Sequence, residues 1–490
     1  MRGTGQVTLA RAGSETLSIP VPRSRSKGRG EGQERQTERK VETMKNLLII
    51  GGSDAGTSAA LRARELDPSV SVTMVVADRF PNFSICGLPF YLSAEVQDWH
   101  SLAHRTASEI EGKGVGLLLD HKAESIDPAG KTVRVSASGG KQFELAYDSL
   151  LVGTGAVSAK PPIAGTDLPG VFFLRWMRDG FALQDYLSEG KVENAVVTGG
   201  GYIGMEMADA LARRGVRTTV IEFADTVLAT MDADLGGLVA GELERNGVSV
   251  VTKTAVREIS RHKDKLMVKC SRGLEIPADL VIVAAGAKPN AALLQSAGAE
   301  TGASGAVKVD RMMRTSLPDV FSAGDCVETW HRVLERHTYL PLGTTAHKQG
   351  RIAGENMVGG KALFQGSLGT QAVKIFDLVA ARTGLRDGDA REAGFQPVTK
   401  RFEAWDHKAY YPGAHKLIVC ITGDWMTGRL LGAQIIGHKT SEVSKRIDIL
   451  ASALYHGMKV SELEHMDLSY TPPLSSPWDP VQMAAQAWRP

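Results

Sequence analysis

The stretch AVVTGGGYIG, residues 195–204, decides how the middle of this chain folds. Hydrophobic residues typical of a buried strand lead into a G-x-G-x-x-G turn, after which the sequence is predicted to be helical. In such a turn the backbone N–H groups and the start of the helix bind a pyrophosphate. Glu222 follows the next predicted strand, residues 217–221, where a carboxylate can accept hydrogen bonds from both hydroxyls of a ribose. The pattern predicts a Rossmann unit that binds a dinucleotide.

The acidic residue after the second strand also indicates which dinucleotide binds. A carboxylate at Glu222 repels a 2′-phosphate, so NADH is favoured over NADPH. Glu206, in the first turns of the predicted helix, faces either the nicotinamide or the solvent. A further strand, residues 279–286, ends in glycine. The residues predicted to bind NAD(P)H are Gly199, Gly201, Tyr202, Ile203, Gly204, Glu206, Glu222 and Gly286.

A similar but imperfect pattern lies earlier in the chain. Residues 46–56, NLLIIGGSDAG, are predicted to form a buried strand, a glycine-rich turn and the start of a helix. Ser53 replaces the second glycine and is small enough to let phosphates approach. The next strand, residues 71–77, lacks a terminal acid, so Asp78 either takes the ribose contact or is an exposed loop residue. The residues predicted to bind a nucleotide here are Gly51, Gly52, Ser53, Ala55, Gly56 and Asp78.

Two later stretches complete this first unit. Residues 147–155 are predicted to form a buried strand with Thr154 and Gly155 at its end. Residues 315–325 place a short buried strand before Gly324 and Asp325, where a carboxylate can accept hydrogen bonds from a polyol such as the ribityl chain of a flavin. Two fingerprints and this third element predict an α/β fold with two Rossmann-like nucleotide-binding domains.

A single cysteine lies between the two fingerprints. Residues 82–91, NFSICGLPFY, place Cys86 shortly before Pro89, which fits the first turn of a helix because its missing N–H needs no partner there. The positive end of a helix lowers the pKa of a thiol and favours the reactive thiolate. This placement is what a redox cysteine beside a flavin needs, but a free cysteine is more commonly a buried, inert thiol, so this stretch alone leaves both interpretations open.

The composition of the 490 residues excludes several other classes of protein. A net charge of +2 gives no field that attracts nucleic acid or an acidic membrane. No apolar run approaches the ~20 residues that span a bilayer. The four cysteines are Cys86, Cys270, Cys326 and Cys420. Their wide spacing predicts no metal site and indicates reduced thiols in a cytoplasmic protein.

The two ends of the chain differ from its middle. Residues 1–43 are rich in Arg, Gly, Ser and Glu, and we expect a disordered tail or an over-extended start. From residue 364 onward the glycine turns become rarer. Strands at residues 416–422 and 430–436 and a helix at residues 446–455 predict a separate α+β domain there.

These motifs together resemble the single-cysteine branch of the pyridine nucleotide-disulfide oxidoreductases, the group of coenzyme A-disulfide reductases and NADH oxidases. The resemblance covers the chain from Met44 to its end. Its most specific stretches are SICGLP at 84–89, residues 199–206, residues 315–325, LGT at 368–370, KIFD at 374–377 and YTPP at 470–473. The resemblance implies an FAD domain in two segments, an NAD(P)-binding domain between them and a C-terminal dimerisation domain. The implied bounds are 44–160 and 289–363, 161–288, and 364–490.

The resemblance also implies an activity. Such a protein is a homodimer that binds FAD and NADH or NADPH and reduces a small disulfide such as coenzyme A disulfide. Cys86 has no second cysteine nearby, so it would cycle through a mixed disulfide or a sulfenic acid. Tyr410 and Tyr470 match positions that reach the active site of the other subunit and assist the thiolate. Ser58 and Arg62 match substrate contacts.

This chain also departs from the family pattern, and alternatives stay open. Phe83-Ser84-Ile85 stands where the family has Phe-Ala-Asn, which makes Ser84 a candidate substrate contact and alters the substrate side of Cys86. Val76 stands where the family usually has Glu. An NADH oxidase or peroxidase, a polysulfide reductase, and a non-catalytic flavin redox sensor are the alternative functions.

Overall fold

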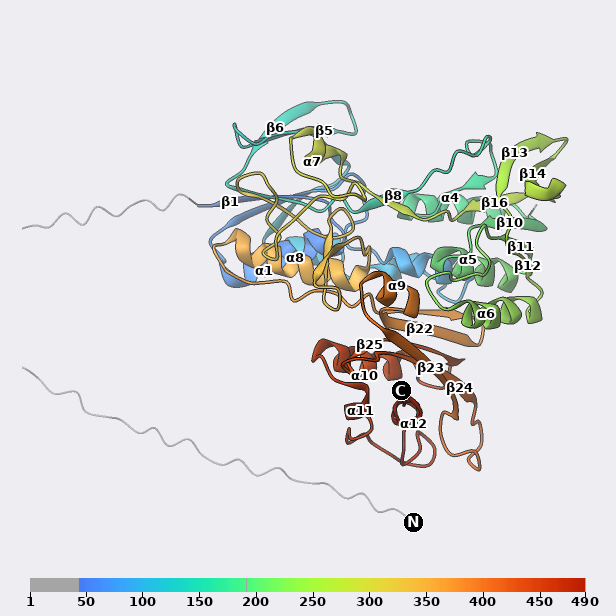
Figure 1. Cartoon of the computed structure of the whole chain (residues 1–490). Helices are drawn as coiled ribbons and strands as arrows, with labels where there is room; N and C mark the ends of the chain where they lie inside the picture. The colour runs from blue at the N-terminus through green and yellow to red at the C-terminus, as the bar shows by residue number, and fades with distance from the viewer. Residues whose placement is uncertain (1–43, 191, 490) are drawn as a thin grey trace, which may run out of the picture. The chain divides into compact units, whose positions relative to one another are not determined.

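A computed structural model describes residues 44–190 and 192–489, so the expectation for residues 1–43 lies outside the described residues. The first sheet has five parallel strands in the order β18-β7-β1-β2-β3 (Figure 1). These strands are β1 (Asn46–Ile50), β2 (Ser71–Val75), β3 (Val115–Leu118), β7 (Ser149–Val152) and β18 (Val320–Ser322). Because β18 lies far from the others in sequence, the first nucleotide-binding unit is built from two separate parts of the chain.

Helices α1 (Asp54–Leu66) and α8 (Gly343–Met357) pack side by side against this sheet (Figure 1). Their backbones approach closely. A Cβ on Gly350 would lie 2.1 Å from the carbonyl oxygen of Ala55. An antiparallel sheet joins the same hydrophobic core, with α7 (Ala292–Ser296) beside it. Its strands are β4 (His121–Asp127), β5 (Thr132–Ala137) and β6 (Gln142–Ala146).

A second parallel sheet has the order β12-β11-β10-β16-β9. Its strands are β9 (Val171–Phe172), β10 (Asn194–Thr198), β11 (Arg217–Ile221), β12 (Ser249–Val251) and β16 (Leu280–Val283). Its helices are α4 (Met177–Ser188), α5 (Tyr202–Arg213) and α6 (Ala233–Arg245). An antiparallel sheet beside it has strands β13 (Val256–His262), β14 (Lys265–Cys270) and β15 (Glu275–Ala278). Strands β8 (Ala156–Ser158) and β17 (Ala287–Pro289) pair where the chain enters and leaves this unit.

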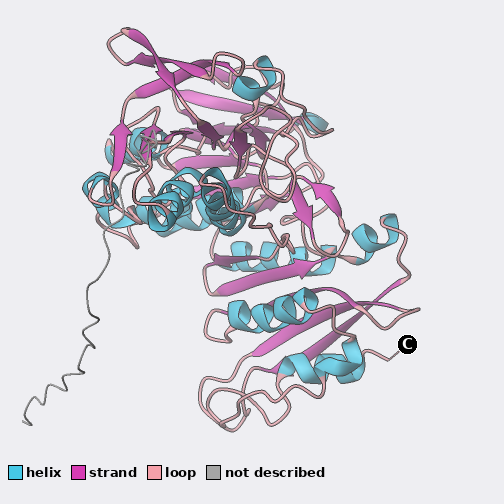
Figure 2. Cartoon of the chain, turned by 90° about the vertical axis from the view of Figure 1, so that its left-hand side faces the viewer, coloured by secondary structure: helices cyan, strands magenta, loops and turns pink. Residues whose placement is uncertain are grey.

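The C-terminal part is an antiparallel sheet between helices, as Figure 2 shows. Its strands, in sheet order, are β21 (Gln371–Ile375), β22 (Leu378–Gly384), β25 (Leu430–His438), β24 (Lys416–Asp424) and β23 (Pro397–Trp405). Leu417 and Val419 pack in the core with α10 (Val443–Tyr455) and α12 (Pro480–Ala487). Ile418 and Cys420 lie on the opposite face, in the core of the second nucleotide-binding unit. Both faces are therefore buried, which explains the continuous hydrophobic run of β24.

The remaining described elements are short. They are α2 (Leu88–Leu92), α3 (Ala107–Glu111), α9 (Asp387–Glu392), α11 (Val460–Leu463), β19 (Thr329–His331), β20 (Arg336–Thr338), and the 3₁₀ turns η1 (Ile85–Gly87), η2 (Trp99–Leu102) and η3 (Ser271–Gly273). No helix in residues 44–190 or 192–489 is long and apolar enough to cross a bilayer.

The predicted fold class is confirmed, with small differences in bounds. The strands predicted at 416–422 and 430–436 each extend two residues further, to Asp424 and His438. The helix predicted at 446–455 begins earlier, at Val443. The chain has two Rossmann-like units and a C-terminal α+β part.

Candidate active site

The turn after β1 forms the first phosphate cradle. Gly51 has φ +105°, and a Cβ there would lie 2.2 Å from the carbonyl oxygen of Gly153. A Cβ on Gly56 would lie 1.9 Å from the oxygen of Gly51. Ser53 precedes the first residue of α1, but its side chain makes no capping hydrogen bond. The N–H groups of the first helical turn are therefore free of a side-chain cap, as a pyrophosphate site requires.

The turn after β10 repeats this geometry. Gly199 has φ +110°, and a Cβ there would lie 2.4 Å from the carbonyl oxygen of Ala284. A Cβ on Gly204 would lie 1.9 Å from the oxygen of Gly199. Gly201 caps α5 without a side chain. Both turns therefore fit a dinucleotide phosphate, and within each turn the first and last glycines of the fingerprint lie against each other.

The residues after β11 and β2 differ in chemistry. The carboxylate of Glu222 accepts hydrogen bonds from the N–H groups of Gly200 (2.5 Å) and Ala224 (2.6 Å). In the first unit the Asp78 carboxylate instead accepts from the N–H of Phe80 (2.8 Å), and burial raises the pKa of Asp78. Asp78 is half-buried, so it is not a fully exposed loop aspartate.

The carboxyl ends of β7 and β18 lie beside the first cradle. Gly324, at φ +88°, packs against Ala55, whose Cβ would lie 3.1 Å from a Cβ on that glycine. Asp325 follows it and pairs with Arg175 at 2.6 Å. After β7, the Thr154 hydroxyl donates to the carbonyl of Asn290 (2.6 Å). This edge of a parallel sheet is where ligands bind in open α/β folds.

The remaining predicted cofactor residues lie at the edges of the two units. Gly155 has φ +68°, and Gly286, which follows β16, has φ +99°. Gly52 has no room for a side chain, because a Cβ there would lie 2.6 Å from Cγ2 of Val76. Tyr202 and Ile203 open α5 and are half-buried.

Cys86 lies in the 3₁₀ turn η1, immediately before α2, and its thiol is exposed. The cysteines at 270, 326 and 420 are buried, and all four are free. The expectation that Cys86 could be a buried thiol is therefore wrong. Among the described residues, Cys86 is the one exposed thiol.

The predicted lowering of the Cys86 pKa is wrong. Burial by the surrounding protein raises the pKa of Cys86, even though the residue is reached by solvent. The charges of Glu206, then Asp54, raise this pKa further, and Arg175 opposes them. Helix α2 has five residues and its N-cap is Gly87, so Cys86 lies outside the helix whose dipole was expected to lower its pKa.

Charged groups from both units act on Cys86. Glu206 belongs to α5 of the second unit, whereas Asp54 belongs to α1 of the first. Both act on the same thiol. Glu206 itself is half-buried rather than facing solvent, and burial raises its pKa to about 7.

The predicted substrate residues have partners within the chain. The Ser58 hydroxyl lies 2.9 Å from Nδ1 of His347. Arg62 forms ion pairs with Glu355 (2.6 Å) and Glu65 (3.1 Å). An anionic substrate group at Arg62 would therefore compete with two carboxylates. Ser84 is half-buried and precedes η1.

The two tyrosine-bearing loops lie next to each other. The N–H of Lys408 donates to the carbonyl of Pro472 (3.2 Å), which joins the loop of Tyr410 to that of Tyr470. Tyr410 is 75% exposed and Tyr470 is 44% exposed. No hydrogen bond or ring contact within the described residues joins either tyrosine to Cys86.

A buried arginine fixes both loops. Arg446 donates to the carbonyl of Asp406 (2.7 Å), before the first loop, and to that of Leu474 (3.3 Å), after the second. It also pairs with the buried carboxylate of Asp479 at 3.2 Å. The loops are thus held from one point in the core.

Sequence reasoning assigns no role to three groups near the site. Arg175 pairs with Asp325, 150 positions away in the chain. Asp54, at the start of α1, lies 3.3 Å from Nε2 of His347. Lys374 reaches α5 from β21. No local motif signals these pairs, because each partner comes from a distant segment.

Comparison with known proteins agrees with this geometry. The family described as "Pyridine nucleotide-disulphide oxidoreductase" matches residues 45–350, and its dimerisation domain matches residues 370–480. The NAD(P)H sulfur oxidoreductase (CoA-dependent) of Pyrococcus abyssi is 33% identical over 450 residues, covering 91% of this chain and 99% of that protein. The coenzyme A disulfide reductase of Staphylococcus haemolyticus is 28% identical, covering 90% of this chain and 98% of that protein.

A solved structure is similar over most of the chain. The NAD-dependent persulfide reductase from A. fulgidus superposes with a TM-score of 0.87 and 38% identity, covering 90% of this chain and 82% of that one. The family assignment rests on these matches. The two glycine-rich turns and the exposed cysteine agree with it. The chain belongs to the pyridine nucleotide-disulphide oxidoreductase family and is an NAD(P)H-dependent flavin oxidoreductase.

Proposed function

We propose that this protein is an FAD-dependent reductase of a small disulfide, such as coenzyme A disulfide, and that it works through a mixed disulfide on Cys86. The observation that carries the proposal is the exposure of Cys86, alone among the four cysteines, beside carboxylates from both nucleotide-binding units. Without a neighbouring cysteine, Cys86 cannot form an internal disulfide, so the second sulfur comes from the substrate.

The chemistry at Cys86 balances in two steps. The Cys86 thiolate attacks one sulfur of RSSR, which breaks the S–S bond, releases RS⁻ and forms the mixed disulfide Cys86–S–S–R. Two electrons then break this mixed disulfide to give Cys86 thiolate and a second RS⁻. Each released thiolate takes a proton to leave as RSH. FAD, when bound, supplies the two-electron connection between NAD(P)H and this disulfide.

The cofactor residues take roles that follow from their positions. The cradle at Gly51 and Gly56 would hold the FAD pyrophosphate, and Asp325 would accept from a hydroxyl of the ribityl chain. The cradle at Gly199 and Gly204 would hold the NADH pyrophosphate. The remaining predicted residues around the two cradles would support these contacts.

We propose that NADH is preferred over NADPH. Glu222 is anchored by two backbone N–H groups, which holds its charge beside the second cradle. A 2′-phosphate placed there would be repelled.

We further propose that two copies of the chain form a homodimer and that Tyr410 and Tyr470 assist the leaving thiolate in the active site of the other copy. Their exposure and the shared anchor at Arg446 support this role. We propose that the FAD domain comprises residues 44–160 and 289–363, the NAD(P)-binding domain residues 161–288 and the dimerisation domain residues 364–490. Four free cysteines support a reducing, cytoplasmic location.

The test combines mass spectrometry with two activity assays. Intact-mass analysis of the isolated protein asks which small thiol is bound to Cys86; a coenzyme A adduct would support coenzyme A disulfide as substrate. NADH consumption with coenzyme A disulfide under argon is then compared with NADH-dependent oxygen consumption. Faster oxygen consumption would favour an NADH oxidase working through a sulfenic acid. Faster turnover with polysulfide would favour a polysulfide reductase, and absence of any turnover would favour a redox sensor.

A further inference from the structure

Helix α5 packs against two other parts of the molecule, the segment that follows Cys86 and the C-terminal sheet. It packs against α2, which follows Cys86, and against β21 of the C-terminal sheet. A narrow crevice separates these elements, lined by Pro89 and Phe90 of α2, Glu206 and Asp209 of α5, and Lys374 of β21. Three parts of the molecule therefore meet here. They are the helix after the second phosphate cradle, the segment that follows Cys86 and the C-terminal sheet.

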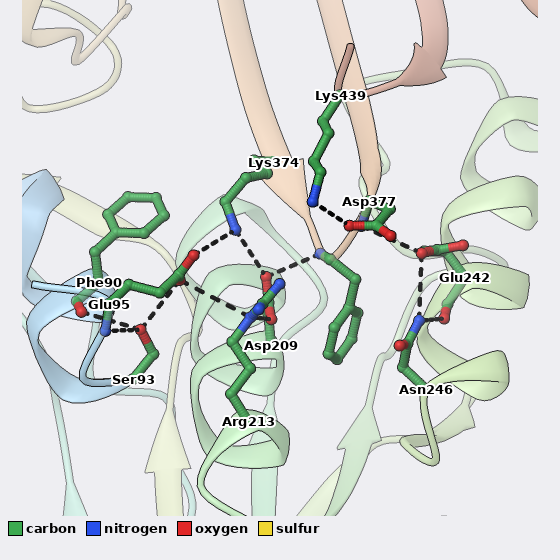
Figure 3. A network of polar contacts seen from close by, with 11 residues as sticks. Phe90, Ser93, Glu95, Asp209, Arg213, Glu242, Asn246, Lys374, Asp377 and Lys439 are labelled. Carbon is green, nitrogen blue, oxygen red and sulfur yellow. Dashed lines mark hydrogen bonds and ion pairs between the residues drawn. The ribbon is translucent and has the colours of Figure 1, made fainter. Parts of the chain in front are cut away.

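Lys374 is the cation that joins these elements, as Figure 3 shows. Its ammonium lies 3.3 Å from a carboxylate oxygen of Glu95, which follows α2, and 3.5 Å from one of Asp209 on α5. It also lies 5.4 Å from the centre of the Phe90 ring. One side chain of the C-terminal sheet thus contacts both nucleotide-binding units.

Asp209 is the buried partner in this network. Its carboxylate accepts hydrogen bonds from Arg213 (2.5 Å) and from the N–H of Phe376 (2.9 Å). Arg213 in turn lies 3.8 Å from Glu95. Because a buried carboxylate needs full compensation, the contacts fix α5 relative to β21 and to the segment after α2.

Glu206 lies in the same crevice, one turn before Asp209. Burial raises the pKa of Glu206 to about 7; the charge of Lys374 lowers it, and that of Asp209 raises it. The charged form of Glu206 in turn raises the pKa of Cys86 in η1. The titratable and charged groups that interact with Glu206 are therefore Lys374 from β21, Asp209 and Tyr202 from α5, and the thiol of Cys86 in η1.

We propose that Lys374 is a positioning residue for hydride transfer, which holds the first turns of α5, with Glu206, against the segment that carries Cys86. The inference rests on the proposed function, because it requires the nicotinamide to bind at the start of α5. It adds a residue from the C-terminal sheet to the machinery of the two nucleotide-binding units.

Three variants of the full-length, FAD-loaded protein test this role. Lys374→Gln removes the charge, and Lys374→Arg keeps it. Lys439→Gln is the matched control, because Lys439 pairs with Asp377 at 2.7 Å in the same region but contacts neither Asp209 nor Glu95 (Figure 3). All three changes lie in partly exposed side chains and are expected to fold.

The first readout does not depend on turnover. The rate of Cys86 alkylation by iodoacetamide is measured from pH 5 to 10 by mass spectrometry. In the wild type, ionisation of Glu206 is expected to produce an inflection near pH 7, because it raises the Cys86 pKa. Lys374→Gln moves the inflection to higher pH, since the lost cation no longer favours the charged carboxylate. Lys374→Arg and Lys439→Gln leave it in place.

The second readout is flavin reduction by saturating NADH in a stopped-flow instrument. Lys374→Gln slows it about tenfold, as expected for a misplaced reactant, while Lys374→Arg stays near the wild-type rate. An unchanged inflection, or an unchanged rate of flavin reduction, in Lys374→Gln would overturn the inference while leaving the proposed function intact. A wild-type protein whose flavin NADH does not reduce would overturn the proposed function instead.

Discussion

Val76 lies over Gly52 in the first unit as Glu222 lies over Gly200 in the second. A Cβ on Gly52 would be 2.6 Å from Cγ2 of Val76, and one on Gly200 would be 2.9 Å from Oε2 of Glu222. The N–H of Val76 donates a hydrogen bond to the carbonyl of Leu118 at the end of β3 (2.9 Å). The N–H of Glu222 likewise donates to the carbonyl of Val251 at the end of β12 (2.9 Å). One structural position therefore carries an apolar side chain in the first unit and a carboxylate in the second.

This difference predicts the effect of changing Glu222. Glu222→Gln keeps the shape but removes the charge that repels a 2′-phosphate, so the ratio of kcat/KM for NADH to that for NADPH is expected to fall at least tenfold. Steady-state kinetics with both nucleotides measures this. Asp78→Asn, in the first unit, is the control and should leave the ratio unchanged; a ratio unaffected by Glu222→Gln would contradict the assignment.

Two glycines of the second cradle are expected to respond differently to alanine. Gly204→Ala places a methyl group 1.9 Å from the oxygen of Gly199, so it should lower the free energy of unfolding by roughly 2 to 3 kcal/mol. Gly201→Ala meets no atom within 4 Å, so stability should change by about 1 kcal/mol or less, while the KM for NADH should rise because the methyl group would narrow the space proposed for the pyrophosphate. Urea unfolding measures the stability of the two variants, and steady-state kinetics measures their KM for NADH. Equal effects on stability would contradict the geometry.

Glu206 is expected to control the reactivity of Cys86. Its charge raises the pKa of Cys86, so Glu206→Gln lowers that pKa and increases the thiolate fraction at pH 8. Alkylation by iodoacetamide at pH 8 should become a few-fold faster. Glu65→Gln, which changes a carboxylate that does not act on Cys86, should have no effect. Slower or unchanged alkylation in Glu206→Gln would show that Glu206 does not act on this thiol.

The two predicted tyrosines can be tested against a neighbour. Tyr410→Phe and Tyr470→Phe remove a hydroxyl that can protonate a leaving thiolate, so disulfide turnover should fall roughly tenfold or more in each. Tyr411 is also exposed, and its ring contacts His407, but no role is assigned to its hydroxyl. Tyr411→Phe is therefore the control. If only Tyr411→Phe lost turnover, the role proposed for Tyr410 and Tyr470 would be contradicted.

The sequence predicted features that depend on adjacent residues. Gly51 and Gly199 adopt positive φ because the chain must turn sharply after a strand, and a local pattern reveals that need. The sequence predicts a lowered pKa for Cys86, whereas the structure indicates a raised one. The helix after Cys86 can be predicted from the adjacent residues, but the carboxylates of Glu206 and Asp54 come from distant segments of the chain. Lys374 lies in the KIFD stretch at 374–377, yet its partners Glu95 and Asp209 lie on other elements. Long-range charge interactions were beyond what local patterns could show.

The central claim is that Cys86 carries out disulfide reduction alone. The measurement that tests it most directly is NADH oxidation by Cys86→Ser with coenzyme A disulfide under argon, together with flavin reduction by NADH in the same variant. We expect flavin reduction to be retained, because both cradles are intact, and disulfide turnover to fall by at least a thousandfold, since serine cannot form the mixed disulfide. Disulfide turnover at the wild-type rate in Cys86→Ser would contradict the account.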